Sequence, residues 1–348
     1  MSEPLPLVSA EGEPGCPKRM VYGPCGGVGE DLTCEMAPVP CPFAARREAV
    51  PWGGSPPDPV TAPPTGLLAT AARRPVVLTD LTVRPFDRAS VEQVAGALAG
   101  SCDGLLVGEH QNRPGFPPAL MAALVRGAGG SPWVTLACRD RNRLVLSQEL
   151  GGLALAGAEG VLCVTGDGRA PGVRPGVTHV FDLDGTRLAA MAAAAGLLVA
   201  VPEAPDARPR AVRPARLRQK QRAGAHLCVL NHVGSTQRLA RFAARARAAG
   251  VTIPLIAGVA VYTDERSAEV LANLPGLHLD REQVKRVLGA PDPVAAGIEA
   301  AVAEARALLA VDGVVGVNLS GLASERGEMF AAQVKASVGQ EIIGDGAR

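Results

Sequence analysis

From residue 75 onward, short apolar runs alternate with longer Ala-rich segments. The apolar runs are rich in Val, Ile and Leu without polar alternation, which is typical of parallel strands buried on both faces. Segments such as 90–100, 144–158 and 236–250 lie between these runs and are long enough to form crossover helices. Eight apolar runs follow this pattern, at residues 75–80, 104–109, 133–138, 160–167, 196–203, 225–231, 253–261 and 313–320.

Eight β-α units predict a (β/α)8 TIM barrel over residues 75–340. A doubly wound open sheet shows the same alternation and is the alternative, but the number of units favours the barrel. The chain has 348 residues, of which 47% are apolar, so it is long enough for the barrel and one small additional domain.

Residues 1–74 have a different character, with Pro and Gly throughout. We interpret 49–74 as a Pro/Gly-rich linker. Residues 1–48 hold half of the eight cysteines, and the four are separated by eight, eight and six residues. In a reducing compartment such a group is expected to bind metal instead of forming disulfides, although a tail with four unliganded thiols is the alternative. The candidate metal ligands are Cys16, Cys25, Cys34 and Cys41.

Charge and composition exclude several classes of function. The chain has 34 acidic and 35 basic residues, which gives no electrostatic basis for binding nucleic acid or an anionic membrane. Aromatic residues make up only 3% of the chain, too few for base-stacking platforms. No apolar run predicts a membrane span, and no secretory signal opens the chain. We therefore expect a cytoplasmic protein with no nucleic-acid or membrane partner.

Polar groups follow most of the predicted strands, at the end where TIM barrels carry their chemistry. Any one of these groups could instead cap the following helix. The Gly-rich loop 164–176 leaves the fourth strand with a carboxylate, and glycines there would let the backbone approach a flat or phosphorylated ligand. The candidate site residues at strand ends are Asp80, Glu109, Arg139, Asp140, Thr165, Gly166, Asp167, Asn231 and His232.

Several stretches in this region resemble the methylenetetrahydrofolate reductase family, in its bacterial branch with a Cys-rich appendage. The stretches are LACRDRNRLVLSQELGGLALAGAEGVLCVTGDG, VFDLDGTRLAAM, LRQKQRAGA, IPLIAGVAV and GVVGVNLSGL, which occur in the family's order between residues 75 and 338. The resemblance implies a TIM barrel that reduces 5,10-methylenetetrahydrofolate to 5-methyltetrahydrofolate, in one-carbon metabolism and methionine supply. It also implies that FAD receives hydride from NAD(P)H and passes it to the folate.

The resemblance implies roles for individual residues. Asp167 would lie between flavin and pterin, and Asn231 would hold the pterin edge, with His232 beside it. Lys220 would approach the flavin phosphates. The other residues implied for the flavin site are Arg139, Asp140, Thr165 and Gly166.

The chain departs from the family at the catalytic acid. The family's glutamate ends strand one within Glu-x-x-Pro-Pro, whereas this chain has LTDLTVRPFD. Asp80 is the nearest carboxylate, and Glu109 after the second strand is a further candidate acid. A histidine expected after the fifth strand is missing from PEAPDARP. A flavin-independent folate reductase, or a non-catalytic folate-binding or electron-transfer accessory subunit, is therefore an alternative.

The N-terminal stretch CPKRMVYGPCGG with CEMAPVPCPF resembles the Cys-rich domain that is fused to, or partnered with, these reductases. The resemblance implies zinc or an iron–sulfur cluster on the four cysteines, together with an electron-transfer partner protein. The sequence does not determine the oligomeric state.

Overall fold

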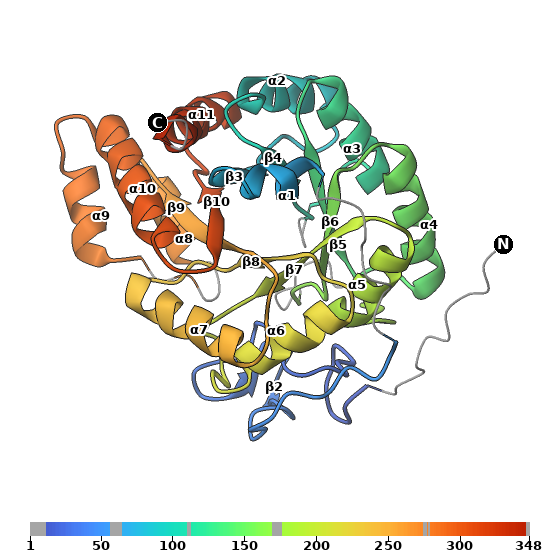
Figure 1. Ribbon diagram of the computed structural model, residues 1–348. Coiled ribbons are helices and arrows are strands. Elements are labelled where there is room, and N and C mark those ends of the chain that lie inside the picture. Colours follow the sequence, from blue (N-terminus) through green and yellow to red (C-terminus); the bar gives the residue numbers. More distant parts are fainter. Residues whose placement is uncertain are drawn as a thin grey trace.

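Eight parallel strands form a closed barrel in the order β10-β3-β4-β5-β6-β7-β8-β9 (Figure 1). The computed structural model describes residues 12–55, 65–109, 113–168, 176–273, 277 and 279–345. The last strand pairs with the first in a parallel register that matches Gly316 with Val76, so the sheet closes. This confirms the predicted TIM barrel and excludes the open sheet. The barrel strands are β3 (Val76–Leu81), β4 (Gly104–Val107), β5 (Pro132–Ala137), β6 (Gly160–Val164), β7 (Leu198–Glu203), β8 (Leu227–Leu230), β9 (Leu255–Val261) and β10 (Val314–Gly321).

Helices follow the strands and surround the barrel (Figure 1). In six of these helices an Asp or Asn side chain at the N-cap accepts a hydrogen bond from a first-turn amide, which explains where the helices begin. Two extra helices, α8 and α9, lie between β9 and the crossover helix α10. The helices after β3 are α2 (Arg88–Leu98), α3 (Pro118–Gly127), α4 (Arg143–Leu155), α5 (Gly185–Ala194), α6 (Arg213–Arg222), α7 (Thr236–Ala248), α8 (Glu265–Ala272), α9 (Arg281–Leu288), α10 (Pro293–Leu309) and α11 (Glu328–Asp345).

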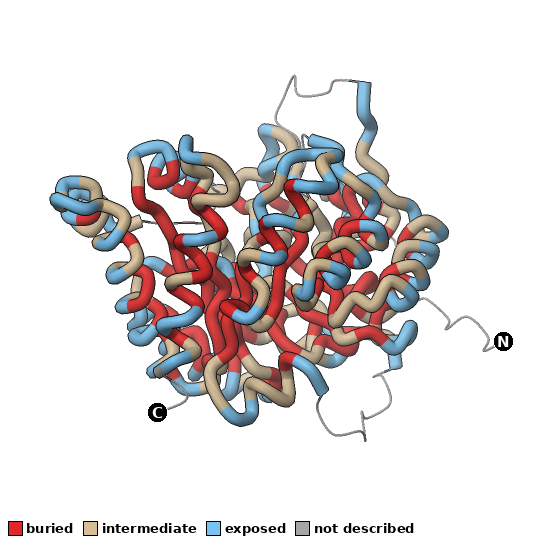
Figure 2. The backbone as a smooth tube through the Cα atoms, turned by 90° about the horizontal axis from the view of Figure 1, so that it is seen from above, coloured by how far each residue is buried: buried red, intermediate tan, exposed pale blue. Residues whose placement is uncertain are grey.

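Alternate residues of each strand pack into two separate apolar clusters. Figure 2 shows the buried strands enclosed by helices that are exposed on their outer faces. Val77 and Val134 belong to the large cluster between strands and helices, whereas Leu78 and Trp133 belong to the cluster inside the barrel. The two clusters follow from the strand period of two, which sends neighbouring side chains to opposite faces. A polar residue at the end of a strand therefore points to the barrel mouth only if it continues the interior series.

The short helix α1 (Gly66–Ala71) closes the N-terminal end of the barrel. Leu67 packs with the interior cluster, and Leu68 and Ala71 lie against it. In Figure 1 this helix lies over the centre of the ring of strands. These residues belong to the predicted linker 49–74, but they form a helix whose apolar side chains cover the bottom of the barrel. The open end of the barrel is therefore the C-terminal rim, where TIM barrels carry their functional sites.

The Cys-rich segment, residues 12–55, packs beside α5 and α6 (Figure 1). It contains one small antiparallel pair, β1 (Thr33–Cys34) and β2 (Ala37–Pro40). The backbone amides of Val21 and Tyr22 donate to Asp184 Oδ2, at 2.9 and 3.1 Å. Asp184 also caps α5, so one carboxylate joins the segment to the barrel.

None of the described helices is long and apolar enough to cross a membrane.

Gly160→Ala tests the packing inside the barrel. A Cβ at Gly160 would collide with the indole of Trp133, which is fully buried. We expect this overpacking to lower the free energy of unfolding by about 1–3 kcal/mol, measured by denaturant titration.

The matched control is Gly151→Ala in α4. No atom lies within 4 Å of a Cβ added at Gly151, so alanine there should stabilise the helix by about 0.5–1 kcal/mol. If both substitutions changed the free energy of unfolding by the same amount, the result would contradict the interior position of Trp133.

Candidate functional site

A pocket of about 640 Å³ opens at the C-terminal ends of β3, β4 and β5. One edge is apolar and includes Phe86 and Phe116, whose rings meet edge to face at 5.7 Å. The lining also includes the charged residues Glu109, Arg139 and Asp140, so three of the predicted site residues line one pocket. A concave site that combines apolar and aromatic side chains with polar groups is suited to a small molecule.

Glu109 is one of the charged residues that line this pocket, and two partners fix its carboxylate. Its Oε2 accepts a hydrogen bond from the Ala137 amide at 3.1 Å, and its Oε1 lies 2.5 Å from Arg141 Nη2. Burial raises the pKa of Glu109 above its ordinary value, although Arg141 opposes this shift. A raised pKa is what a carboxylic acid needs to donate a proton near neutral pH.

Asp80 does not line this pocket, but the next residue, Leu81, does. Asp80 continues the interior series of β3, which runs through Val76 and Leu78. Asn318 Nδ2 donates to Asp80 Oδ1 at 2.9 Å, and Lys335 Nζ donates to the Asp80 carbonyl oxygen at 2.8 Å. The carboxylate and the backbone of Asp80 are therefore both fixed by partners on other elements.

The loop after β6 lies beside the pocket and beneath the Cys-rich segment. Arg139 Nη1 donates to the Asp167 carbonyl oxygen at 3.4 Å, and the Asp167 side chain is exposed. From the Cys-rich segment, Lys18 Nζ donates to the Gly166 carbonyl oxygen at 2.6 Å, and Met20 Sδ lies 3.4 Å from Thr165 Oγ1. Thr165 and Gly166, which the family resemblance assigns to the flavin site, thus contact the protein's own N-terminal segment.

Lys220 lies in a buried charge cluster. Its Nζ lies 3.0 Å from Glu203 Oε2 and also donates to the Pro202 carbonyl oxygen. Burial lowers the pKa of Lys220 to about 8. Burial would raise the pKa of Glu203, but the charges of Lys220, Arg216 and Arg213 outweigh it and hold that pKa well below its usual range. The ammonium group of Lys220 is therefore turned to Glu203.

These contacts do not fit the predicted flavin site. Lys220 is 4% exposed and its donors face Glu203, which leaves little for a phosphate. A Cβ at Gly168 would collide with Met36 of the Cys-rich segment. The arrangement therefore does not suit FAD. FAD binding stays a prediction from the resemblance.

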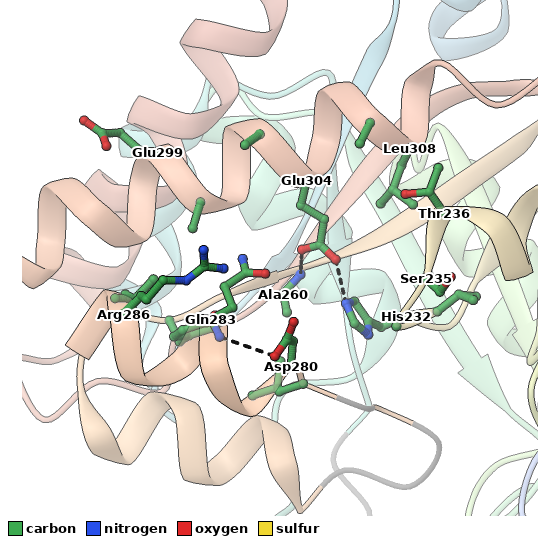
Figure 3. A pocket seen from close by; sticks show the side chains of 18 of the residues that line it. His232, Ser235, Thr236, Ala260, Asp280, Gln283, Arg286, Glu299, Glu304 and Leu308 are labelled. Carbon is green, nitrogen blue, oxygen red and sulfur yellow. Dashed lines mark hydrogen bonds and ion pairs between the residues drawn. The ribbon is translucent and has the colours of Figure 1, made fainter. Parts of the chain in front are cut away.

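Asn231 and His232 follow β8 on a different part of the rim. The Asn231 side chain is exposed and continues the interior series of β8. His232 instead lines a second pocket of about 570 Å³ between α7, α9 and α10 (Figure 3). There its Nε2 lies 2.7 Å from Glu304 Oε1, and Glu304 Oε2 accepts a hydrogen bond from the Ala260 amide at 3.2 Å. Asn231 therefore continues the interior face of β8, whereas His232 lines the second pocket.

The four N-terminal thiols gather in one region of the Cys-rich segment. Cys41 is buried among Met20, Val28 and Phe43, and Cys16 and Cys25 pack against this cluster. Burial raises the pKa of Cys25 to about 11, and its Sγ lies 3.4 Å from Glu35 Oε1. Among the residues that the structure describes, no three His, Cys, Asp or Glu side chains form a group that could hold a metal ion.

The thiols of the described segment therefore do not form a ligand set for zinc or an iron–sulfur cluster. Metal binding by Cys16, Cys25, Cys34 and Cys41 stays a prediction from the sequence.

Sequence reasoning missed Lys18 and Glu304. Lys18 comes from the N-terminal segment and reaches the rim only through the tertiary fold. A signal was present, since lysine occurs at only four positions and one of them is inside the Cys-rich motif. Glu304 is a carboxylate between Ala303 and Ala305 on α10, a helix whose buried face is otherwise apolar.

Comparison with known proteins establishes the fold. An uncharacterized protein from Clostridium thermocellum that binds two copies of 5-methyl-5,6,7,8-tetrahydrofolic acid has a similar structure, with a TM-score of 0.54 and 10% sequence identity. The similarity covers 78% of this chain and 98% of that protein. A candidate lyase/mutase from Burkholderia cenocepacia has a TM-score of 0.39 and 14% identity, over 66% of this chain and 97% of that one. No protein-family model and no curated protein matches the sequence.

Glu203→Gln tests the buried charge cluster. The substitution leaves three buried cations without their counter-charge, so we expect it to cost about 3–5 kcal/mol of stability at neutral pH. A carboxylate with a lowered folded-state pKa stabilises the fold above its unfolded-state pKa, about 4.3, and this contribution is lost as the pH falls further. The difference in thermal unfolding between wild type and variant should therefore narrow below that pH.

Glu30→Gln is the control for this experiment. Glu30 also contacts two arginines, Arg208 and Arg210, but its side chain is 65% exposed. Solvent screens exposed pairs, so this variant should unfold at the wild-type temperature. If Glu30→Gln lowered the unfolding temperature as much as Glu203→Gln, burial could not be the cause of the loss of stability.

Proposed function

We propose that this protein binds a reduced folate at the C-terminal rim of its barrel and reduces 5,10-methylenetetrahydrofolate to 5-methyltetrahydrofolate with NAD(P)H. The observation that carries the proposal is the rim pocket of about 640 Å³, which has both aromatic and charged lining residues and includes Leu81, the residue after the fixed Asp80. The similar fold of a protein described as binding 5-methyl-5,6,7,8-tetrahydrofolic acid supports the choice of ligand.

The chemistry of the pocket suits a folate. The pterin is flat and rich in hydrogen-bonding groups, and Phe86 and Phe116 offer an apolar edge for such a ring. The glutamate tail is anionic, and Arg113, which is exposed, lines the same pocket with donors suited to carboxylates. Asn318 Oδ1, beside Asp80, is buried and has no hydrogen-bond partner in the described part of the structure. A donor from the pterin would satisfy this acceptor.

The reaction needs one proton and one hydride. The bond between N10 and the methylene carbon breaks, N10 takes a proton, and the resulting N5 iminium ion accepts hydride at the methylene carbon. NAD(P)H supplies the hydride and leaves as NAD(P)+. We assign the proton to Asp80, which Asn318 orients, and Glu109 is the second candidate acid.

Direct transfer from the nicotinamide to the folate is the form of the reaction that the contacts favour. Thr165 and Gly166 are covered by the Cys-rich segment and Lys220 is held by Glu203. A nicotinamide placed at the barrel mouth would not require these residues. Asp167 and Asn231 remain exposed at the rim and are proposed to contact the folate.

Asp80→Asn tests the assignment of the acid. The substitution keeps an oxygen for Asn318 but removes the proton donor, so turnover should fall by about 100-fold or more while folate binding changes little. Steady-state NAD(P)H oxidation with 5,10-methylenetetrahydrofolate measures the first effect, and titration with 5-methyltetrahydrofolate measures the second. Asp312→Asn, an exposed carboxylate before β10 at the opposite end of the barrel, is the matched control.

The outcomes separate the candidate functions. If Asp80→Asn turns over normally, the acid lies elsewhere and Glu109→Gln is the next variant. A non-catalytic folate-binding or electron-transfer subunit is the second candidate, favoured by the hydrogen bond that occupies Asp80 Oδ1. It takes the lead if the wild-type protein binds 5-methyltetrahydrofolate but never oxidises NAD(P)H, even with flavin and a reductant supplied. Absence of both binding and turnover would refute the reductase and the folate-binding subunit.

A further inference from the structure

Lys18 is a buried cation that the Cys-rich segment contributes to the barrel rim. Its side chain is 3% exposed, and its Nζ forms an ion pair with Glu35 of the same segment. The ammonium group also donates at 2.6 Å to the carbonyl oxygen of Gly166, which is 148 residues away in the chain. A buried ammonium group is costly unless it is paired and hydrogen-bonded, and these two partners meet that condition.

Two cations hold consecutive carbonyl groups on the loop after β6. Lys18 binds the Gly166 carbonyl oxygen, and Arg139, at the end of β5, binds the Asp167 carbonyl oxygen at 3.4 Å. Gly166 has φ +96°, a conformation that glycine adopts readily and other residues rarely do. The backbone on both sides of the Asp167 side chain is therefore held, while the carboxylate itself is exposed at the rim.

The remaining contacts of the segment fall on the same loop. Met20 Sδ lies 3.4 Å from Thr165 Oγ1, and Met36 lies where a Cβ of Gly168 would stand. Three side chains of the segment thus contact Thr165, Gly166 and Gly168. If the segment packed only on the outer surface of the barrel, it would contact the helices α5 and α6 but not this loop.

The other buried lysines of the chain make the same type of contact. Lys335 on α11 donates to the Asp80 carbonyl oxygen, and Lys220 on α6 donates to the Pro202 carbonyl oxygen. All three carbonyl groups lie at the C-terminal ends of barrel strands or in the loops that follow. Two of these lysines belong to the barrel's own helices, and Lys18 performs the equivalent task from outside the barrel.

We propose that the Cys-rich segment completes the rim site, and that Lys18 is a positioning residue that holds the 165–168 loop so that Asp167 faces the folate. This proposal rests on the proposed function for its ligand. The loop-holding part rests on the contacts alone and can be measured without any folate.

The test compares Lys18→Met with Lys18→Arg in the full chain. Lys18→Met removes the charge-assisted hydrogen bond, so backbone amide exchange in residues 165–168, and at the Gly185 amide that donates to Thr165 Oγ1, should rise by about tenfold or more. Exchange in β10 and β3, on the opposite side of the barrel from β6, should not change. Lys18→Arg keeps a cation and should recover part of the protection.

The kinetic readout separates positioning from general loss of structure. Lys18→Met should raise the KM for 5,10-methylenetetrahydrofolate by about tenfold while kcat changes much less, because Asp167 is misplaced and Asp80 is not. The affinity for 5-methyltetrahydrofolate, measured by titration, should fall in parallel. Lys285→Met, which removes a lysine with a 72% exposed side chain, should match wild type in every measurement.

Each result decides the proposal. Unchanged exchange in residues 165–168, or an equal rise in every strand, would overturn it, as would a fall in kcat at unchanged KM. If Lys18→Met does not fold, Glu35→Gln weakens the same ion pair and should raise loop exchange to a smaller extent. If the wild-type protein binds no folate but loop exchange responds as expected, the proposed function fails and the positioning role of Lys18 stands.

Discussion

The buried ion cluster around Glu203 is the interaction on which much of this structure depends. Glu203 ends β7, and its carboxylate lies among the side chains of Arg213, Arg216 and Lys220. Arg213 is fully buried and also donates to the carbonyl oxygens of Pro24 and Cys25 in the Cys-rich segment. One guanidinium group with five donors therefore joins a barrel strand to the N-terminal segment. Without the Glu203 charge these cations would lie unpaired in the interior.

Cations also organise the rim itself. Lysine is rare in this chain, and Lys18, Lys220 and Lys335, three of its four lysines, are buried with their ammonium groups on backbone carbonyl oxygens. Lysine suits this task because its compact ammonium group can donate to a carbonyl and a carboxylate at once, whereas the guanidinium group of arginine is a planar fork. A rim held in this way presents its side chains from a fixed backbone, which is what binding and proton transfer require.

The candidate site could be predicted in part because barrel topology places all strand ends on one rim. Glu109, Arg139 and Asp140 do line one pocket, as neighbours on adjacent strands should. His232 follows Asn231 directly but lies in a second pocket with Glu304, because successive residues at a strand end point to opposite faces. The partner of Lys220 could not be predicted either, since Glu203 becomes a neighbour only when α6 packs on β7.

The sequence by itself determined the barrel, because eight runs of continuously apolar residues with long crossovers have few other ways to bury both faces of their strands. It also determined that polar groups follow the strands, since residue order decides what comes after each run. Only the tertiary structure decided which of these groups meet, that α1 closes the bottom of the barrel, and that the Cys-rich segment lies on the rim. These features depend on contacts between residues far apart in the chain, such as that between Lys18 and Gly166. The partner of each residue in such a contact is decided only when the chain folds.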